Sequence, residues 1–335
     1  MRLVFMGTPA FAVPSLEAVI HAGHEVVGVC TQPDRVQGRG QTLALSPVKT
    51  LALARGIPVM QPTKMRSPEC MQQLAEWRPD AIAVTAFGRI LPKAILDLPP
   101  MGCINVHASL LPGYRGAAPV QWALIHGDTE TGITTMHMDE GMDTGDMLLQ
   151  RTVPIAPEDT AAELGARLAT VGGALLVETL KQVEAGTIVP RKQNPAQATF
   201  APLLRKEDGA IPWTQSAVEI VNRIRGLSPW PGSYTFHRRH RLIVWKARVA
   251  VGGGADGGER CQPGTILAVG PTSFLVGTGE GGVEVLDVQP VNRKRMSAAQ
   301  FLQGHALPVG AVLTPQPQED MADSERQTSE LAGPV

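Results

Sequence analysis

The sequence has little cysteine, and none of it is spaced for a metal site or a disulfide framework. Four cysteines are scattered over 335 residues, three of them inside apolar stretches, and no C-x-x-C is present. Zinc-binding and disulfide-stapled folds need cysteines paired at short spacings, so neither is expected. The composition predicts reduced, buried thiols in a cytoplasmic protein that holds no metal.

Long apolar runs are also missing. No stretch comes near the roughly 18 consecutive apolar residues that a membrane-spanning helix requires. Hydrophobic residues nevertheless make up 43% of the chain, which is enough for packed cores. A length of 335 residues suits two domains better than one. We therefore expect a two-domain globular protein without a membrane span.

The motifs of two common kinds of α/β enzyme are absent where they would be needed. The loop after the first apolar run, residues 7–11, reads Gly-Thr-Pro-Ala-Phe. It lacks the further glycines that let a pyrophosphate approach the backbone, and it lacks G-K-[ST]. No serine lies in G-x-S-x-G, which excludes the nucleophile turn of an α/β-hydrolase.

The net charge of −1 hides a basic segment. Residues 205–248 carry nine Lys or Arg and three Asp or Glu, a net of +6. A local surplus of this kind is typical of a surface that binds a polyanion. A solvated surface that balances acidic residues elsewhere gives the same count, so charge alone leaves both interpretations open.

The first half of the chain alternates apolar strands with amphipathic helices. Near-continuous apolar strands separated by helices indicate a mostly parallel sheet covered on both faces. Residues 1–189 are therefore predicted to form a Rossmann-like α/β domain. Strands are expected at 3–6, 25–30, 57–60, 81–85, 102–106, 133–138 and 146–151, and helices at 10–21, 47–55, 67–77, 116–126 and 161–184.

The pattern changes in the second half. Residues 190–205 are proline-bearing and without periodicity, which predicts a linker. Residues 206–313 are predicted to form a small antiparallel β-barrel, and the polar residues 314–335 a disordered tail. In the barrel, a helix near 214–225 precedes strands near 233–236, 241–249, 263–269, 273–277 and 282–288.

Chemistry-bearing side chains stand where the fifth strand leaves its sheet. Asn105, His107 and Ser109 alternate, so they share one face, and ligand sites form at this end of parallel strands. The amide can donate to a developing oxyanion, and the imidazole can donate or move a proton. Asp143, in the Gly-punctuated loop 138–146, can orient the imidazole. A structural histidine and an Asx turn are the alternatives, but the combination favours a catalytic site.

Two segments resemble the signature of the folate-dependent formyltransferases. They are Asn105-x-His107-x-Ser109-Leu110-Leu111-Pro112-x-Tyr114-Arg115-Gly116 and Met142-Asp143-Thr144-Gly145-Asp146. Within that superfamily, the chain from Arg2 to about Leu313 is most similar to the methionyl-tRNA formyltransferase family. The C-terminal domain of that family contains an oligonucleotide-binding (OB)-like barrel.

The resemblance implies a catalytic trio of Asn105, His107 and Asp143. It also implies that the formyl donor is 10-formyltetrahydrofolate and that no metal takes part. Relatives often carry Tyr at Phe87, so a ring contact is expected there without the phenolic hydroxyl. The residues implied to bind folate are Phe87, Gly88, Arg89, Ile90, Leu91, Ser109, Leu110, Leu111, Pro112, Asp139, Glu140 and Gly141.

The partner implied by the resemblance is initiator Met-tRNA. In this family the loop matching residues 31–41 engages the acceptor arm, whereas without the resemblance it reads equally well as a solvated loop. A monomer is the simplest expectation. The residues expected to bind tRNA are Arg35, Arg39, Lys206, Arg223, Arg225, Arg239, Arg241 and Lys246.

Two alternatives stay open at this point. The first is a superfamily enzyme that formylates a sugar-nucleotide amine or glycinamide ribonucleotide. The second is a non-catalytic RNA-binding protein on the same scaffold. The roughly 130 additional C-terminal residues, the Arg-bearing loop and the intact trio favour the enzyme that acts on tRNA.

Overall fold

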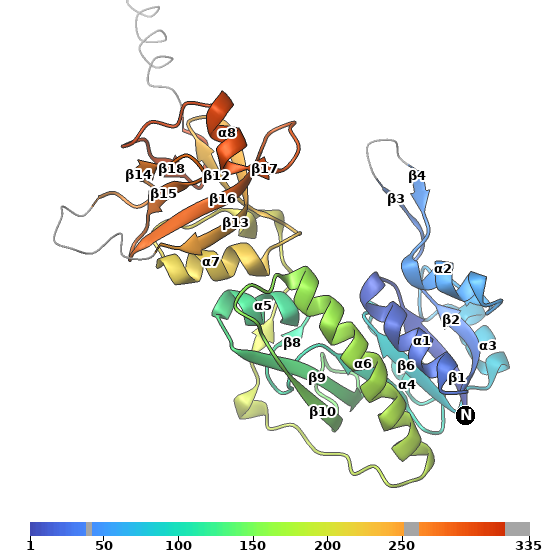
Figure 1. Ribbon diagram of the computed structural model, residues 1–335. Helices are drawn as coiled ribbons and strands as arrows, with labels where there is room; N and C mark the ends of the chain where they lie inside the picture. The colour runs from blue at the N-terminus through green and yellow to red at the C-terminus, as the bar shows by residue number, and fades with distance from the viewer. Residues whose placement is uncertain (38–41, 251–260, 319–335) are drawn as a thin grey trace, which may run out of the picture. The chain divides into compact units, whose positions relative to one another are not determined.

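A computed structural model of the chain describes residues 1–37, 42–250 and 261–318 (Figure 1). The chain divides into two compact units. The first comprises Met1–Trp122, Thr129–Pro157 and Glu163–Leu203. The second comprises Ala123–Asp128, Glu158–Ala162 and the chain from Leu204 onward. Each unit has its own sheet and core, so each is described by itself.

The first unit is built on a seven-stranded sheet with the order β10-β9-β7-β6-β1-β2-β5. The neighbours from β7 through β6, β1 and β2 to β5 are parallel, and β9 and β10 continue the sheet antiparallel beyond β7. This arrangement confirms the predicted mostly parallel sheet. The strands are β1 (Arg2–Gly7), β2 (Glu25–Cys30), β5 (Val59–Met60), β6 (Ala81–Thr85), β7 (Cys103–His107), β9 (Glu130–His137) and β10 (Met147–Pro154).

Helices cover both faces of this sheet, as the buried apolar strands require. On one face, Gly172 lets helix α6 approach Val106 of β7 closely, because a Cβ there would stand 2.9 Å from Val106 Cγ1. On the other face, Leu74 and Ile95 pack into a core cluster with Ile82. The helices are α1 (Val13–His21), preceded by a 3-10 turn at Ala10–Ala12, α2 (Pro47–Ala54), α3 (Pro68–Trp77), α4 (Lys93–Leu96), α5 (Pro119–His126) and α6 (Ala161–Glu184).

Two of these helices begin at a Ser-Pro pair. The Ser46 hydroxyl accepts a hydrogen bond from the Lys49 backbone N–H, and the Ser67 hydroxyl accepts one from that of Cys70. Proline follows each serine at the first helical position, where its missing N–H has no intrahelical partner to lose. The pattern explains why the predicted starts of α2 and α3 fall within a residue of the observed ones.

A β-hairpin replaces the polar loop predicted after β2. Strands β3 (Arg35–Gln37) and β4 (Thr42–Ala44) pair antiparallel and extend away from the sheet beyond α2 (Figure 1). At the base of the hairpin, Asp34 accepts hydrogen bonds from the Lys49 ammonium and the Gln61 amide. Arg35 contributes its backbone to β3, and its side chain lies outside the described part of the structure. Arg39 lies outside the described residues altogether.

The segment for which the sequence predicts a linker is bonded to the first unit through residue 201. Arg191 and Met147 exchange backbone hydrogen bonds of 2.8 Å. After a 3-10 turn at Pro195–Gln197, β11 (Phe200–Ala201) pairs parallel with β8 (Arg115–Gly116). The loop that follows β7 is therefore held by residues almost 90 positions later in the chain.

The second unit is a curled antiparallel sheet with the order β14-β15-β16-β13-β12-β18, and β17 pairs with β16. A bridge between Thr265 and Val312 brings the two ends of the sheet together. The predicted small barrel is confirmed. Its elements are a 3-10 turn at Lys206–Gly209, α7 (Ala217–Gly226), β12 (Ser233–His237), β13 (His240–Val249), β14 (Ile266–Val269), β15 (Phe274–Gly277), β16 (Gly282–Pro290), β17 (Met296–Ser297), α8 (Ala298–Gly304) and β18 (Leu313–Thr314).

The barrel core is filled from the sheet and from both helices. Ile220 and Ile224 of α7 and Phe301 of α8 pack with Phe274 of β15. A reciprocal capping box between Ser216 and Glu219 begins α7. Of the predicted tail, residues 314–318 are described, and 319–335 lie outside the described residues. Within the described residues, no helix combines the length and apolar character needed to cross a membrane.

Leu74→Ala should lower the free energy of unfolding of the first unit by about 3 kcal/mol, because the side chain is fully buried and the change leaves a cavity. Leu53→Ala on α2 makes the same change at a side chain that is 52% exposed, and should cost well under 1 kcal/mol. Urea unfolding followed by circular dichroism measures both values. Equal losses in the two variants would contradict the described core.

Candidate active site

Two of the predicted site residues lie at the carboxyl end of β7, in the interior of the sheet. Asn105 pairs with Val84 of β6 and Met136 of β9, and His107 pairs with Thr134. Asn105 is half-buried, and His107 is 6% exposed. Within the described part of the chain, the Asn105 carboxamide makes no side-chain hydrogen bond, which leaves its N–H groups for a ligand.

The His107 ring lies between two hydrogen-bond acceptors. Its Nε2 is 2.9 Å from the carbonyl oxygen of Tyr114, and its Nδ1 is 3.6 Å from Oδ2 of Asp143. A carbonyl only accepts, so Nε2 carries a proton and donates it. Nδ1 is therefore the nitrogen that faces Asp143, and the ring is placed to be stabilised by that carboxylate when it is charged.

Asp143 approaches His107 from a turn with a left-handed backbone, φ +55°. Its Oδ2 accepts a hydrogen bond of 2.9 Å from the backbone N–H of Gly116, and its side chain is 17% exposed. Asp tolerates this conformation better than most residues. The structure thus brings the histidine and the carboxylate predicted from the sequence into one site.

The loop after β7 is fixed by hydroxyl and amide groups. The Ser109 hydroxyl donates to the Gly113 carbonyl at 2.6 Å, and the Thr134 hydroxyl donates to the Ser109 carbonyl at 2.7 Å. The Leu111 N–H donates to Thr134 Oγ1, and Gln150 Nε2 donates to the Leu111 carbonyl. The sequence predicts that Ser109 binds folate. In the structure its hydroxyl is bonded to the Gly113 carbonyl and shapes the loop.

The same loop is held from the segment after α6. Tyr114, at φ +59°, donates its backbone N–H to Oγ1 of Thr199 at 2.8 Å, and the Arg115 N–H donates to the Thr199 carbonyl at 2.8 Å. These hydrogen bonds fix the direction of the Tyr114 carbonyl, which accepts a hydrogen bond from His107 Nε2. Sequence reasoning missed both contacts: Thr199 belongs to no quoted motif, and Tyr114, which stands in the quoted signature, acts through its backbone carbonyl, which a motif does not reveal.

In residues 87–92, a segment predicted to hold folate, some side chains are buried and others are exposed. Phe87 and Leu91 are each 2% exposed and belong to the core, whereas Ile90 is 85% exposed. Gln32 Nε2 donates to the carbonyls of Phe87 and Gly88 at 2.9 and 3.3 Å. Contact with a ligand from Phe87 or Leu91 would therefore come mainly from the backbone.

The other predicted folate segment, residues 139–141, is a self-bonded turn. Oδ1 of Asp139 accepts from the Gly141 N–H at 3.0 Å and from the Thr144 hydroxyl at 2.7 Å. Glu140 is exposed. The carboxylate of Asp139 shapes the turn that precedes Asp143.

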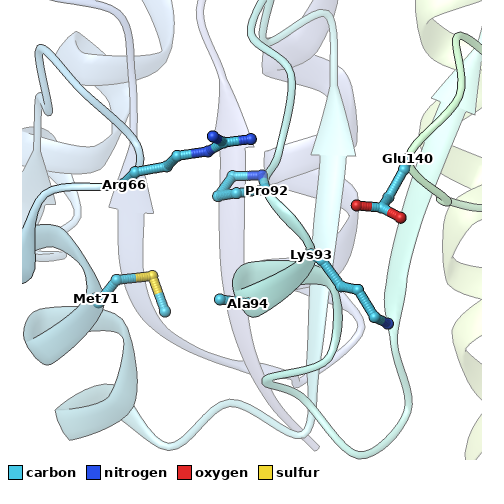
Figure 2. Close-up of a pocket in the computed structure, with 6 residues that line it drawn as sticks. All are labelled: Arg66, Met71, Pro92, Lys93, Ala94 and Glu140. Carbon is cyan, nitrogen blue, oxygen red and sulfur yellow. The ribbon is translucent and has the colours of Figure 1, made fainter.

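A pocket of about 370 Å³ adjoins two of the three predicted folate segments, through Pro92 at the end of the first and Glu140 in the last (Figure 2). Its lining combines apolar side chains with charged side chains of both signs. A hydrogen bond with Asp97 raises the pKa of Lys93, so this lysine stays charged. The pocket is lined by Arg66, Met71, Pro92, Lys93, Ala94 and Glu140.

In the second unit, two of the predicted tRNA-binding arginines are bonded within the protein. Arg223 donates to the Asp208 carbonyl from Nε at 3.1 Å and from Nη2 at 2.6 Å. Arg225 donates to the Asp159 carbonyl and to Oδ1 of Asn222. Burial lowers the pKa of both arginines below the usual range. Their guanidinium groups hold the end of α7.

The remaining predicted tRNA-binding residues of this unit lie in the 3-10 turn before α7 and in the hairpin of β12 and β13. Lys206, Arg239 and Lys246 are exposed, and Lys246 lies 3.7 Å from Glu158. The Arg241 guanidinium stacks over the Tyr234 ring at 3.9 Å from its centroid. Among the described residues, no group of three or more His, Cys, Asp or Glu side chains is arranged to hold a metal ion.

Comparison with known proteins matches both units to one family. The formyl transferase family matches residues 1–180, and the formyl transferase C-terminal domain matches residues 203–306. The methionyl-tRNA formyltransferase of Solibacter usitatus is 54% identical over 307 residues, covering 92% of this chain and 96% of that protein. That of Geobacter sulfurreducens is 49% identical over 313 residues, covering 93% and 96%.

Solved structures share the fold at low sequence identity. An N-formyltransferase from Helicobacter canadensis, in complex with folinic acid and dTDP-3-aminofucose, has a TM-score of 0.62 at 18% identity, covering 86% of this chain and 98% of its own. HypX from Aquifex aeolicus, in complex with tetrahydrofolic acid, has a TM-score of 0.61 at 18% identity, covering 93% and 50%.

Gly116→Ala should lower the free energy of unfolding by about 1–3 kcal/mol, because Gly116 has φ +121° and a Cβ would stand 2.7 Å from the Ala201 carbonyl oxygen. Gly165→Ala is the matched control, since the helical Gly165 has open space around its Cβ position and alanine favours the helix. Thermal unfolding of the two variants tests the packing of β8 against β11. A Gly116→Ala protein as stable as the wild type would refute it.

Proposed function

This chain belongs to the methionyl-tRNA formyltransferase family, and on that basis we propose that it transfers the formyl group of 10-formyltetrahydrofolate to the α-amino group of methionine on initiator tRNA. The His107–Asp143 pair beside Asn105, at the carboxyl end of β7, is the observation that carries the proposal at the level of chemistry. Such a protein works in the cytoplasm, where translation begins.

The first step is attack of the methionine amine on the formyl carbon. It produces a tetrahedral intermediate with negative charge on the former carbonyl oxygen. Asn105 donates to this oxygen from its carboxamide, which has no other side-chain partner among the described residues. Positioned donors of this kind stabilise the charge that develops in the transition state.

His107 and Asp143 act together on charge and protons. Since the Nε2–H donates to the Tyr114 carbonyl, Nδ1 is the ring nitrogen left for the oxyanion, and it donates when the ring is charged and Nδ1 also carries a proton. Asp143 stabilises the charged ring and, directly or through a water, takes the proton that leaves the amine. A proton is then returned to N10 of the folate as the leaving group departs.

The transfer is direct, without an acyl-enzyme. The two nucleophile candidates near the trio are unsuited to attack: Ser109 donates its hydroxyl to a carbonyl, and burial raises the pKa of the Cys103 thiol to about 12. Neither has a base that would activate it in this environment. The amine of the substrate is the remaining nucleophile.

The folate is held in the pocket of Figure 2 and along the adjoining backbone. Arg66 and Lys93 at its rim supply positive charge for the carboxylates of the folate tail. The exposed Ile90 side chain supplies an apolar contact to the folate. Some of the residues predicted from the sequence to bind folate therefore contact it through backbone groups rather than side chains.

The tRNA phosphates are bound in part by Lys206, Arg239 and Lys246 of the second unit, whose side chains reach solvent. Arg223 and Arg225 support this surface through their carbonyl contacts. The segment 31–41, whose sequence includes Arg35 and Arg39, meets the acceptor end. Binding of this kind is dominated by release of counterions and is therefore sensitive to salt.

Asn105→Ala, His107→Ala and Asp143→Ala should each lower kcat by about 100-fold or more, since one positioned donor contributes about 2.7–4 kcal/mol to the barrier. Folate affinity should change little. Formation of formylmethionyl-tRNA from 10-formyltetrahydrofolate measures kcat, and His21→Ala, an exposed position at the end of α1, is the control. A kcat within about threefold of wild type in any of the three would remove that residue from the mechanism.

The same assay separates the proposed acceptor from its alternatives. Wild-type protein should formylate methionine on charged initiator tRNA and leave a sugar-nucleotide amine and glycinamide ribonucleotide unmodified. Formylation of either small amine in place of the tRNA would assign the chain a different acceptor.

Lys206→Ala and Lys246→Ala should each weaken tRNA binding and reduce the slope of log K against log salt by about 1, because each removes one phosphate contact. Lys181→Ala on α6 makes the same change in the first unit and should leave the slope unaltered. Filter binding between about 50 and 200 mM salt measures the slopes. Over this range the affinity of a protein with several phosphate contacts falls by orders of magnitude. A flat wild-type response would rule out a phosphate-binding surface.

A further inference from the structure

A buried glutamine outside both family matches is bonded to the acidic loop. Gln193 lies between residues 180 and 203, where the two matches end and begin, and it is 9% exposed. Its Nε2 donates to the backbone carbonyls of Asp143 and Gly145, each at 2.8 Å. One amide therefore uses both of its N–H groups to hold the backbone on either side of Thr144.

The other end of the same amide is fixed by an arginine. Oε1 of Gln193 accepts from Nε of Arg115 at 3.1 Å and from Nη2 at 2.8 Å, and Arg115 is 6% exposed. A guanidinium only donates and a carbonyl only accepts, so the amide has one consistent orientation. Gln193 cannot rotate without leaving buried polar groups unsatisfied.

These contacts close a ring around Asp143. Arg115 reaches the Asp143 backbone through Gln193, while the next residue, Gly116, donates its N–H to the Asp143 carboxylate. The backbone and the carboxylate of Asp143 are thus both held, directly or through Gln193, by residues of one short strand, β8. The carboxylate stands 3.6 Å from His107 Nδ1, a separation at which a small displacement decides whether a hydrogen bond forms.

We propose that Gln193 is a positioning residue that sets the Asp143 carboxylate against His107 during the transfer reaction. The proposal rests on the proposed function and deepens it. Gln193 does not touch substrate. It acts through the backbone of Asp143, and a misplacement of about 1 Å at such a site costs on the order of 100-fold in rate.

Gln193→Glu isolates the two donated hydrogen bonds. The carboxylate keeps acceptors for Arg115 but turns an oxygen toward the Asp143 and Gly145 carbonyls, so the clamp on the loop is lost. Gln193→Met removes the polar groups at similar volume. Each variant should lose at least tenfold in kcat while the KM for 10-formyltetrahydrofolate stays within twofold. Gln72→Glu, an exposed position on α3, makes the same chemical change as a control.

A double-mutant cycle with Asp143→Asn tests the route of the effect. If Gln193 acts through Asp143, then Gln193→Glu should reduce kcat less than twofold in the Asp143→Asn background. Single-turnover measurements with excess enzyme give the rates. Equal fold-losses in the two backgrounds would overturn the proposal, because they would show that Gln193 acts by another path.

The outcomes are separable from those of the proposed function. Wild-type protein that forms no formylmethionyl-tRNA refutes the function itself. Active wild type with both Gln193 variants within twofold of its kcat refutes the positioning role. Failure of both variants to fold, seen as loss of the thermal transition, also refutes it, because the glutamine would then hold the domain rather than the loop.

Discussion

The proposed chemistry depends on the direction of one imidazole ring. His107 is the last residue of β7 and is buried. Its ring would be free to rotate if the ring nitrogens had no hydrogen-bond partners. The Tyr114 carbonyl accepts a hydrogen bond from Nε2–H, so Nδ1 is turned toward the Asp143 carboxylate. Tyr114 can offer that carbonyl because its backbone is left-handed and its N–H is held by Thr199. The site therefore depends on contacts that join the end of β7 to a segment almost 90 residues later.

The loop after β7 is extensively bonded for the same reason. Ser109, Thr134 and Gln150 bond its first half, and β11 pairs with its second half. Each bond satisfies a backbone group that would otherwise be buried without a partner. In the proposed reaction, these contacts hold the imidazole and the carboxylate in place before substrate binds, which is the condition for electrostatic stabilisation of a transition state.

Much of the fold and the outline of the site follow from the sequence, for local reasons. The alternation of strands and helices, the Ser-Pro helix starts and the period-two spacing of Asn105 and His107 are all readable within a few residues. The roles of Phe87, Ile90 and Gln193 are not. Burial of Phe87 and exposure of Ile90 depend on how the loop packs, and Gln193 acquires its role only because distant Arg115 and Asp143 lie beside it. Such non-local contacts leave no periodic signal.

The basic segment of the second unit shows the same limit for electrostatics. Its net charge of +6 counts every arginine equally. Arg223 and Arg225 direct their guanidinium groups to the carbonyls of Asp208 and Asp159, where they satisfy buried polar groups. Their charge still contributes to the long-range field that attracts a polyanion, but several of their N–H donors are already bonded within the protein. In the proposed tRNA complex, steering and contact are thus divided between residues: the whole segment contributes to the first, and exposed side chains such as Lys206 and Lys246 contribute to the second.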